Sequence, residues 1–151
     1  MSVGPLYPAP LAGSPNLVRL TFRIQAAAAG GADPDFIYPS NTPVVSGYNV
    51  ATGIYGIKFA TVYPGFVGGI GAVMPATTTT LEKIVLIDTA DYNTTTGVLT
   101  VQVAQQDTST PDADGDINAV DMVDNDWLYL DLVFVTAASD AVVGALAALT
   151  P

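Results

Sequence analysis

The chain contains no cysteine and no histidine. Without histidine it lacks the usual general base near neutral pH and the commonest metal ligand in proteins. Without cysteine it forms no disulfide, and it lacks the readiest nucleophile and the preferred ligand of soft metals. These two absences remove most ordinary catalytic sites and favour a structural or binding role.

Positive charge is also scarce. Only four of the 151 residues are cations, against fourteen acidic residues, which gives a net charge of −10. Nucleic-acid binding needs clustered Lys and Arg to neutralise phosphates, so we expect no nucleic-acid partner. Anionic membranes should repel the chain for the same reason.

Targeting and membrane segments are not expected either. Residues 1–15 carry no positive region and contain four prolines, unlike a secretory signal. Residues 137–149 form the longest stretch of small apolar residues, but they are too few to span a bilayer and include Asp140. We therefore expect a soluble protein made in the cytoplasm, with no membrane partner.

Half of the residues are hydrophobic and 12% are charged, which fits one folded domain with a substantial core. Residues 16–25 alternate cleanly, with Val18, Leu20, Phe22 and Ile24 on one face and polar residues on the other. The same period of two, typical of a strand with one buried face, recurs in three more segments. These are residues 54–62, 98–104 and 127–135.

Weaker strand signals lie between these segments. Residues 66–74 are apolar with three glycines, which indicates bulges or a close approach of backbones. A phosphate-binding glycine loop is disfavoured there, because no Lys or Ser/Thr follows at the required spacing. Residues 83–88 form a further short strand, and Asn93 to Gly97 form a turn. Within the loop at residues 26–43 we expect one short extended piece at residues 36–38.

Together these patterns predict an all-β fold, an antiparallel, jelly-roll-like β-sandwich in residues 16–138. An extended proline-rich arm, residues 1–15, precedes it, and a tail or short helix, residues 139–151, follows it. The arm is either a frayed terminus or a segment that lies along a neighbouring subunit. Its apolar residues are its candidate contacts. They are Leu6, Tyr7 and Leu11.

The strand at residues 127–135 is apolar on both faces, which predicts a central strand or one that meets another subunit. Asp131 argues against complete burial of its second face. Arg19 and Arg23 share the polar face of residues 16–25, where they are either solvated or in contact with an acidic neighbour. The candidate interface residues of the two strands are Arg19, Arg23, Trp127 and Tyr129.

An acidic connection, residues 105–126, holds seven of the thirteen aspartates. Within it, residues 110–121 (TPDADGDINAVD) resemble the calcium loops of dockerin-type and EF-hand modules, with Gly115 at the turn position. The pattern departs from those loops because Thr110 stands where Asp is expected and no exiting helix follows. A solvated loop of turn-forming residues is therefore favoured over calcium, the one cofactor that we consider. The candidate ligands are Asp112, Asp114, Asp116 and Asp121.

Other site chemistries find little support. The only glutamate, Glu82, lies beside Lys83, where we expect a solvated ion pair, and the loop aspartates should behave as ordinary acids. No histidine is present to activate a Ser or Thr, so we expect no enzyme. A sugar-binding aromatic platform is conceivable, although aromatic residues at strand spacing more often belong to cores or interfaces. Its candidates are Tyr55, Tyr63, Tyr92, Trp127 and Tyr129.

The order of several segments along the chain resembles that of a known protein family. The chain runs GIYGIKFATVYPGFVG, KIVLID, TTTGVLTVQVA, an Asp/Gly loop and DNDWLYLDLVFVTAAS, from Gly53 to Ser139. This succession resembles the decoration (cement) proteins of tailed-bacteriophage heads. It implies a small, non-enzymatic β-sandwich on the outer surface of the virion, often a homotrimer, that bridges major capsid proteins and stabilises the shell.

Two alternatives remain open from the sequence. One is a carbohydrate- or calcium-binding β-sandwich module of a tail or fibre. The other is a self-polymerising fibre or surface-layer subunit, with the N-terminal arm donated as a strand.

Overall fold

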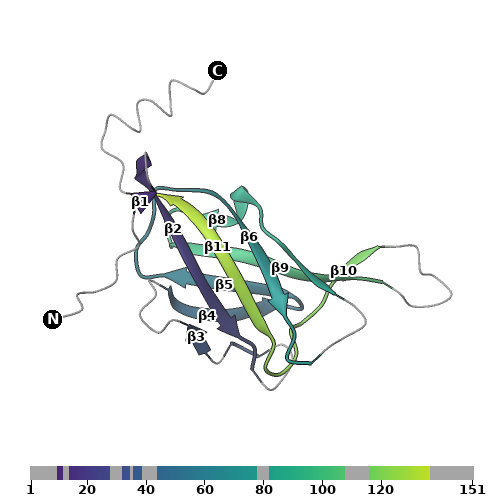
Figure 1. The fold of residues 1–151 in the computed structure, drawn as a ribbon. Helices are drawn as coiled ribbons and strands as arrows, with labels where there is room; N and C mark the ends of the chain where they lie inside the picture. The colour runs from purple at the N-terminus through teal and green to yellow at the C-terminus, as the bar shows by residue number, and fades with distance from the viewer. Residues whose placement is uncertain are drawn as a thin grey trace.

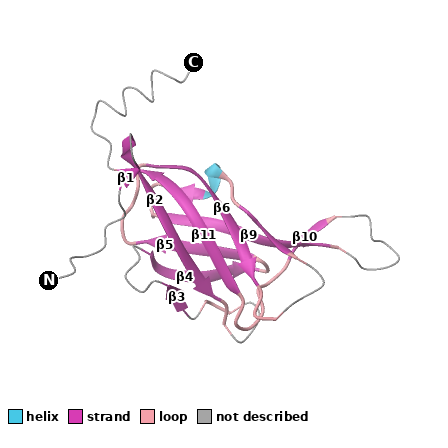
Figure 2. Cartoon of the chain, viewed as in Figure 1, coloured by secondary structure: helices cyan, strands magenta, loops and turns pink. Residues whose placement is uncertain are grey.

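The computed structural model describes residues 10–11, 14–27, 32–34, 36–38, 44–77, 82–107 and 116–136. Almost all of their regular structure is β-strand, as Figure 2 shows. The helical content of this part is one 3-10 turn, η1 (Thr89–Asp91), which Asp88 caps by accepting a hydrogen bond from Ala90 N. No helix among the described residues has the length and apolar character needed to cross a membrane.

The first sheet, sheet A, is antiparallel and is built on three long strands in the order β2, β11, β6. Two short strands, β1 and β3, pair with β2 at its two ends. β11 pairs on both sides, so the prediction of a central strand at residues 127–135 is confirmed. The strands are β1 (Pro10–Leu11), β2 (Ser14–Gln25), β3 (Phe36–Tyr38), β6 (Gly65–Met74) and β11 (Trp127–Val135).

The second sheet, sheet B, is centred on β9. The registers place β5 and β10 one after the other along one edge of β9, and β7 and β8 along the opposite edge. β4 lies beyond β5 and forms the outer edge. The strands are β4 (Val44–Ala51), β5 (Ile54–Phe59), β7 (Lys83–Leu86), β8 (Tyr92–Asn93), β9 (Val98–Gln106) and β10 (Ile117–Ala119).

The two sheets pack face to face as an antiparallel β-sandwich, and the strands of sheet A cross those of sheet B (Figure 1). The chain alternates between the layers, and the first and last long strands, β2 and β11, are neighbours in sheet A. The predicted sandwich is therefore confirmed. Alternation explains it, because each strand sends every second side chain into the space between the sheets.

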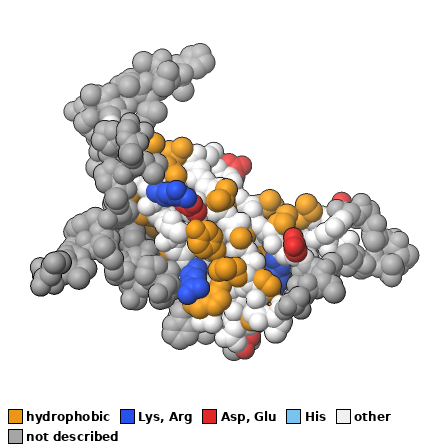
Figure 3. All heavy atoms as spheres, in the orientation of Figure 1, with side chains coloured by type: hydrophobic (Ala, Val, Ile, Leu, Met, Phe, Trp, Pro, Cys, Tyr) orange, Lys and Arg blue, Asp and Glu red, His pale blue; other side chains and the backbone are white. Residues whose placement is uncertain are grey.

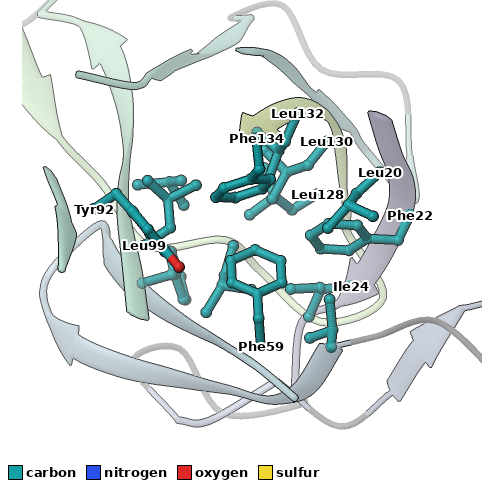
Figure 4. Packing of buried hydrophobic residues seen from close by; sticks show 14 of the residues in the cluster. Leu20, Phe22, Ile24, Phe59, Tyr92, Leu99, Leu128, Leu130, Leu132 and Phe134 are labelled. Atoms are coloured by element: carbon teal, nitrogen blue, oxygen red, sulfur yellow. The ribbon is translucent and has the colours of Figure 1, made fainter. Parts of the chain in front are cut away.

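Large apolar side chains from both layers fill the core. Leu20, Phe22 and Ile24 of β2 are buried beside the inward leucines of β11. Figure 4 shows Phe59, from β5 of the other sheet, pointing into the same space. Its ring centroid is 5.0 Å from that of Phe134 and 6.1 Å from that of Phe22, both near edge-to-face, which is a favourable aromatic geometry.

Two buried tyrosines use their hydroxyl groups to hold loops against the core. Tyr92 Oη accepts the Tyr63 N–H at 2.8 Å and donates to the Tyr63 carbonyl at 3.2 Å. Tyr55 Oη accepts the Met122 N–H at 2.9 Å. Burial raises the pKa of Tyr55 and Tyr92, and also that of the neighbouring Tyr63, so these phenols stay protonated at neutral pH.

The hairpin between β4 and β5 depends on Gly53. Its φ is +67°, a conformation that residues with a side chain rarely adopt. A Cβ there would lie 2.6 Å from the Val103 carbonyl oxygen and from Val120 N. The Gly53 carbonyl accepts the Val103 N–H at 2.7 Å, so the turn fits between β5 and β10 along β9.

Most predicted strands are present, with shifted ends. The strand predicted at residues 54–62 ends at Phe59, and the one at residues 98–104 continues to Gln106. The extended piece at Phe36–Tyr38 is confirmed as β3. Four strands were not predicted, namely β1, β4, β8 and β10.

The termini are described only in part. Of the predicted arm, residues 10–11 form β1 and pair with β2 of the same chain. Residues 14–15 belong to β2, so the sandwich begins inside the predicted arm. Leu6, Tyr7 and the tail at residues 139–151 lie outside the described residues, and for Leu11 only the backbone pairing is described.

Candidate interaction surface

The outer face of sheet A gathers four of the predicted interface residues. The registers set Arg23 of β2 beside Tyr129 of β11, and Gln25 beside Trp127 and then Met74 of β6. Figure 3 views this face and shows hydrophobic side chains beside the cationic ones. We call it the outer face: Arg19, Thr21, Arg23, Gln25, Val67, Ile70, Ala72, Met74, Trp127, Tyr129, Asp131 and Val133.

An ion pair fixes one end of the outer face. Arg19 holds both carboxylate oxygens of Asp131, with Nε donating to Oδ1 at 2.7 Å and Nη2 to Oδ2. The Thr21 hydroxyl donates to the same carboxylate at 3.4 Å. The hydrogen bond from Arg19 lowers the pKa of Asp131, although burial opposes the charge. Asp131 is therefore ionised at neutral pH, and its bidentate partner holds it in one orientation.

Asp131 is buried, with 8% of its surface exposed. The second face of β11 is not completely buried, as expected, because Trp127, Tyr129 and Val133 are only half-buried, but Asp131 itself is covered. The physical reason is that Arg19, from the neighbouring strand, lies over the carboxylate and satisfies it.

A cation–π contact stabilises the opposite end of the outer face. The Arg23 guanidinium lies 4.4 Å from the ring centroid of Trp127. This stacking fixes a long side chain against a flat ring and presents both as one surface. Arg23 and Trp127 were predicted separately as interface residues, and the structure places them in contact.

A shallow depression of about 340 Å³ lies between the ion pair and the edge of the sheet. Its floor includes Gly68 and Gly69, which have no side chains, and the exposed side chains of Val67 and Ile70 border it. Ile70 is 70% exposed and Val67 is 51% exposed, so two large apolar side chains of β6 meet solvent beside this depression. Sequence reasoning noted the glycines of this strand but missed the depression, because its walls come from three different strands.

Cationic residues lie in strands, whereas most of the described acidic residues lie in the connections between strands. All four cations lie in strands, two of them on the outer face. Among the described acidic residues, Asp131 is the one that lies in a strand, and the others lie in loops, turns or η1. The outer face therefore carries two cations and one anion in a chain whose net charge is −10.

The acidic connection is structured where it is described. Asp121 Oδ1 accepts the Gly53 N–H at 2.7 Å and lies 3.4 Å from Asn49 Nδ2, so this carboxylate holds the β4–β5 turn. Asp116 precedes β10, and its carbonyl accepts the Asp107 N–H at 2.7 Å. Asp112 and Asp114 lie outside the described residues, so the calcium hypothesis stays a prediction. Within the described residues, no three acidic side chains are grouped to hold a metal ion.

Asp126, at the end of this connection, corrects two expectations. Its carboxylate is 1% exposed and lies 2.8 Å from Lys83 Nζ, so the partner of Lys83 is Asp126 and not Glu82. Burial opposes its charge, but hydrogen bonds from Lys83, Val123 N and Ala76 N outweigh that effect and lower its pKa. Asp126 is thus a buried structural ion and not an ordinary hydrated acid.

The aromatic candidates for a sugar platform separate into two groups. Tyr55, Tyr63 and Tyr92 are buried in the core. Trp127 and Tyr129 are half-buried on the outer face, where Arg23 stacks on the tryptophan. The five residues therefore do not form one exposed cluster.

No protein-family model, curated protein or solved structure matches this chain. The outer face of sheet A is accordingly the feature from which a function can be argued.

Proposed function

We propose that this protein is a structural component of a tailed-bacteriophage head that binds the outside of the assembled shell and bridges its major capsid proteins. The observation that carries the proposal is the outer face of sheet A. It combines exposed apolar side chains, a shallow depression and a fixed ion pair on three hydrogen-bonded strands. The succession of segments that resembles decoration proteins contributes β5, β6, β7, β9 and β11 to this same sandwich.

The physical character of the face suits binding to a protein surface. Rigid strands lose little conformational entropy on association, so preorganised apolar contacts translate more fully into affinity. Arg23 and Trp127 belong to the residue types that most often dominate binding energy at protein interfaces. Carboxylates in the connections keep an otherwise hydrophobic chain dispersed, and they repel the nucleic acid that a head contains.

The symmetry of a capsid shell also favours such a role. A shell repeats the same site many times, so a face of modest affinity is occupied wherever the site recurs, and bridging two capsid proteins multiplies its effect. No catalytic group is required for such a role.

The test is to mix the purified protein with heads of the encoding phage that lack it, and to measure co-sedimentation. We expect saturable binding, with density on the outer surface in electron cryomicroscopy. Tyr129→Glu should weaken binding at least tenfold, because it places a charge in the centre of the outer face. A matched control is Val45→Glu, which puts the same charge on an exposed residue of β4 in the other sheet. Absence of binding, or equal weakening by both variants, would overturn the proposal.

A further inference from the structure

Arg19 has more hydrogen-bonding capacity than its ion pair uses. Its Nε and Nη2 donate to the Asp131 carboxylate, but a guanidinium carries five N–H donors. Among the described residues, no acceptor is found for Nη1 or for the second N–H of Nη2. The Arg19 side chain is 55% exposed, so these donors are open to solvent on the outer face. The ion pair therefore holds an oriented cation that still has donors for a partner.

The depression on the outer face combines this cation with apolar side chains. Arg19 is one of the residues that line it, and Val67 and Ile70 of β6 contribute exposed branched side chains. At Gly68 a Cβ would meet nothing within 4 Å, so the space above this residue is open. Figure 3 shows the same mixture of cationic and hydrophobic side chains on this face. A group that enters the depression can therefore meet both kinds of contact at once.

The local charge of the outer face is opposite to that of the whole chain. Asp131 is its one acidic side chain and is neutralised by Arg19, while Arg23 adds a second cation. The other described acidic residues lie in loops, turns or η1, and the chain has a net charge of −10. Exposed charges are screened beyond about 8–10 Å at moderate ionic strength, so the arginines dominate close to this face. A carboxylate of a partner is therefore attracted to the outer face more than to the acidic connections.

Shape and charge together select the class of partner. Sites for small molecules enclose most of their ligand, whereas this depression is shallow and open. Nucleic acids and anionic membranes present extended negative charge, which the acidic connections of the chain repel. A protein surface can instead project one carboxylate beside one apolar side chain. Charge complementarity therefore favours an acidic segment of a protein.

We propose that the depression receives an aliphatic side chain whose neighbour in sequence is an aspartate or glutamate, both supplied by the protein that the outer face binds. The aliphatic group lies over Gly68 against Val67 and Ile70, and the carboxylate accepts hydrogen bonds from the remaining donors of Arg19. Arg19 then lies between two carboxylates, that of Asp131 and that of the partner. The identity of the partner as a capsid protein rests on the proposed function, whereas the recognised chemistry rests on the residues of the depression.

The first test uses a synthetic peptide, acetyl-Gly-Asp-Leu-Asp-Gly-amide, titrated into the isotope-labelled full chain and followed by NMR. An aspartate on each side of the leucine lets the peptide bind in either direction. We expect saturable shifts of the amides of residues 67–70 at millimolar peptide, because one charge-assisted contact and one apolar contact supply modest affinity. Two control peptides replace both aspartates by asparagine, or the leucine by serine. Each control peptide should bind at least fivefold more weakly.

A double variant tests the role of the guanidinium. Arg19→Gln combined with Asp131→Asn removes the ion pair as a whole, so it leaves no buried charge unpaired and keeps the net charge at −10. It should weaken binding of the peptide at least fivefold, and the unchanged net charge excludes a general electrostatic cause. Lys58→Gln removes an exposed cation from β5, in the other sheet, and should leave the affinity unchanged. The amide spectra check that both proteins remain folded.

The second test uses phage heads that lack the protein. The double variant should bind them at least fivefold more weakly than the wild type, and Lys58→Gln should bind them equally well. Binding of the wild type should also weaken as sodium chloride is raised, because salt screens the contact with the partner carboxylate.

Three results would overturn the proposed contact: no saturable shifts at residues 67–70, equal binding of the asparagine peptide, or binding of phosphatidylserine vesicles through the same residues, which would make the partner a membrane. Heads that bind the double variant as well as the wild type would reject the contact and leave the proposed function standing. Peptide binding that the double variant loses, together with heads that bind neither protein, would reject the proposed function and leave the contact standing.

Discussion

The ion pair between Lys83 and Asp126 offers the sharpest test of how the sandwich is held together. Asp126 accepts hydrogen bonds from Lys83 Nζ at 2.8 Å, Val123 N at 3.0 Å and Ala76 N at 3.1 Å. Its carbonyl also accepts the Ala26 N–H at 2.8 Å. One residue therefore joins the end of β2, the β6–β7 connection and the approach to β11.

The variant Lys83→Met removes the ammonium group and keeps the length of the side chain. It leaves a carboxylate that is 1% exposed with two backbone donors and no counter-charge. Breaking a buried pair in this way costs about 3–5 kcal/mol, and the 14% exposure of the Lys83 side chain moves the expectation to about 2–4 kcal/mol. In a domain of this size that loss lowers the melting temperature by about 5–15 °C.

The second variant, Asp126→Asn, completes a double-mutant cycle. With Lys83→Met, the neutral amide no longer needs a counter-charge. The double variant should therefore be more stable than the sum of the single losses predicts, by about 1 kcal/mol or more. Urea unfolding followed by far-ultraviolet circular dichroism measures all four proteins.

The pH dependence has a defined sign. The folded protein lowers the pKa of Asp126, so its contribution is complete above the unfolded value of about 3.9 and is lost as pH falls through the lower folded pKa. The stability gap between the wild type and Lys83→Met should thus be largest near pH 7 and shrink in acid. A gap below about 0.5 kcal/mol at pH 7, or one of equal size at pH 7 and pH 2, would refute the reasoning.

Three further substitutions test the core and one turn. Tyr92→Phe removes the hydroxyl that serves both backbone groups of Tyr63, and it should cost about 1–3 kcal/mol in urea unfolding. Gly53→Ala should cost about 2 kcal/mol or more, because its Cβ would lie 2.6 Å from the Val103 carbonyl oxygen at a positive φ. Phe134→Ala should cost about 3–5 kcal/mol, since it empties the centre of the aromatic cluster, and thermal unfolding measures the loss.

Each substitution has a control of the same kind on the surface. Tyr129→Phe removes a hydroxyl from the half-buried outer face, and Thr52→Ala alters the exposed neighbour of the turn glycine. Val62→Ala shortens an apolar side chain that is 47% exposed. Each control should change the free energy of unfolding by about 0.5 kcal/mol or less. A control as damaging as its buried counterpart would contradict the assigned cause.

Strands with one buried face could be predicted because alternation is a local property. In β2 and β11 every second residue is apolar, and the structure buries those residues against the other sheet. β4 escaped prediction because Gly47 and Asn49 interrupt the alternation, and its place is set by pairing with β5. β10 is three residues long and depends on the edge of β9.

The surface features depended on contacts between distant residues. Arg19 and Asp131 are 112 residues apart, and Lys83 and Asp126 are 43 apart, so neither pair shares a sequence pattern. Arg23 and Trp127 were each named as interface residues, yet their stacking follows from the register between β2 and β11. The sequence therefore allowed individual interface residues to be predicted, but the residues that they contact became known only from the fold.

Trp127 is the only tryptophan of the chain, and it lies beneath the Arg23 guanidinium on the outer face and away from the core. Tryptophan emission responds to the polarity and charge around the indole, so the ultraviolet fluorescence of this protein reports on one external surface. The molecule carries a built-in optical probe of whatever covers that surface. Its signal should change when a partner displaces water and shifts the guanidinium, while the aromatic core remains spectrally silent at wavelengths that excite tryptophan alone.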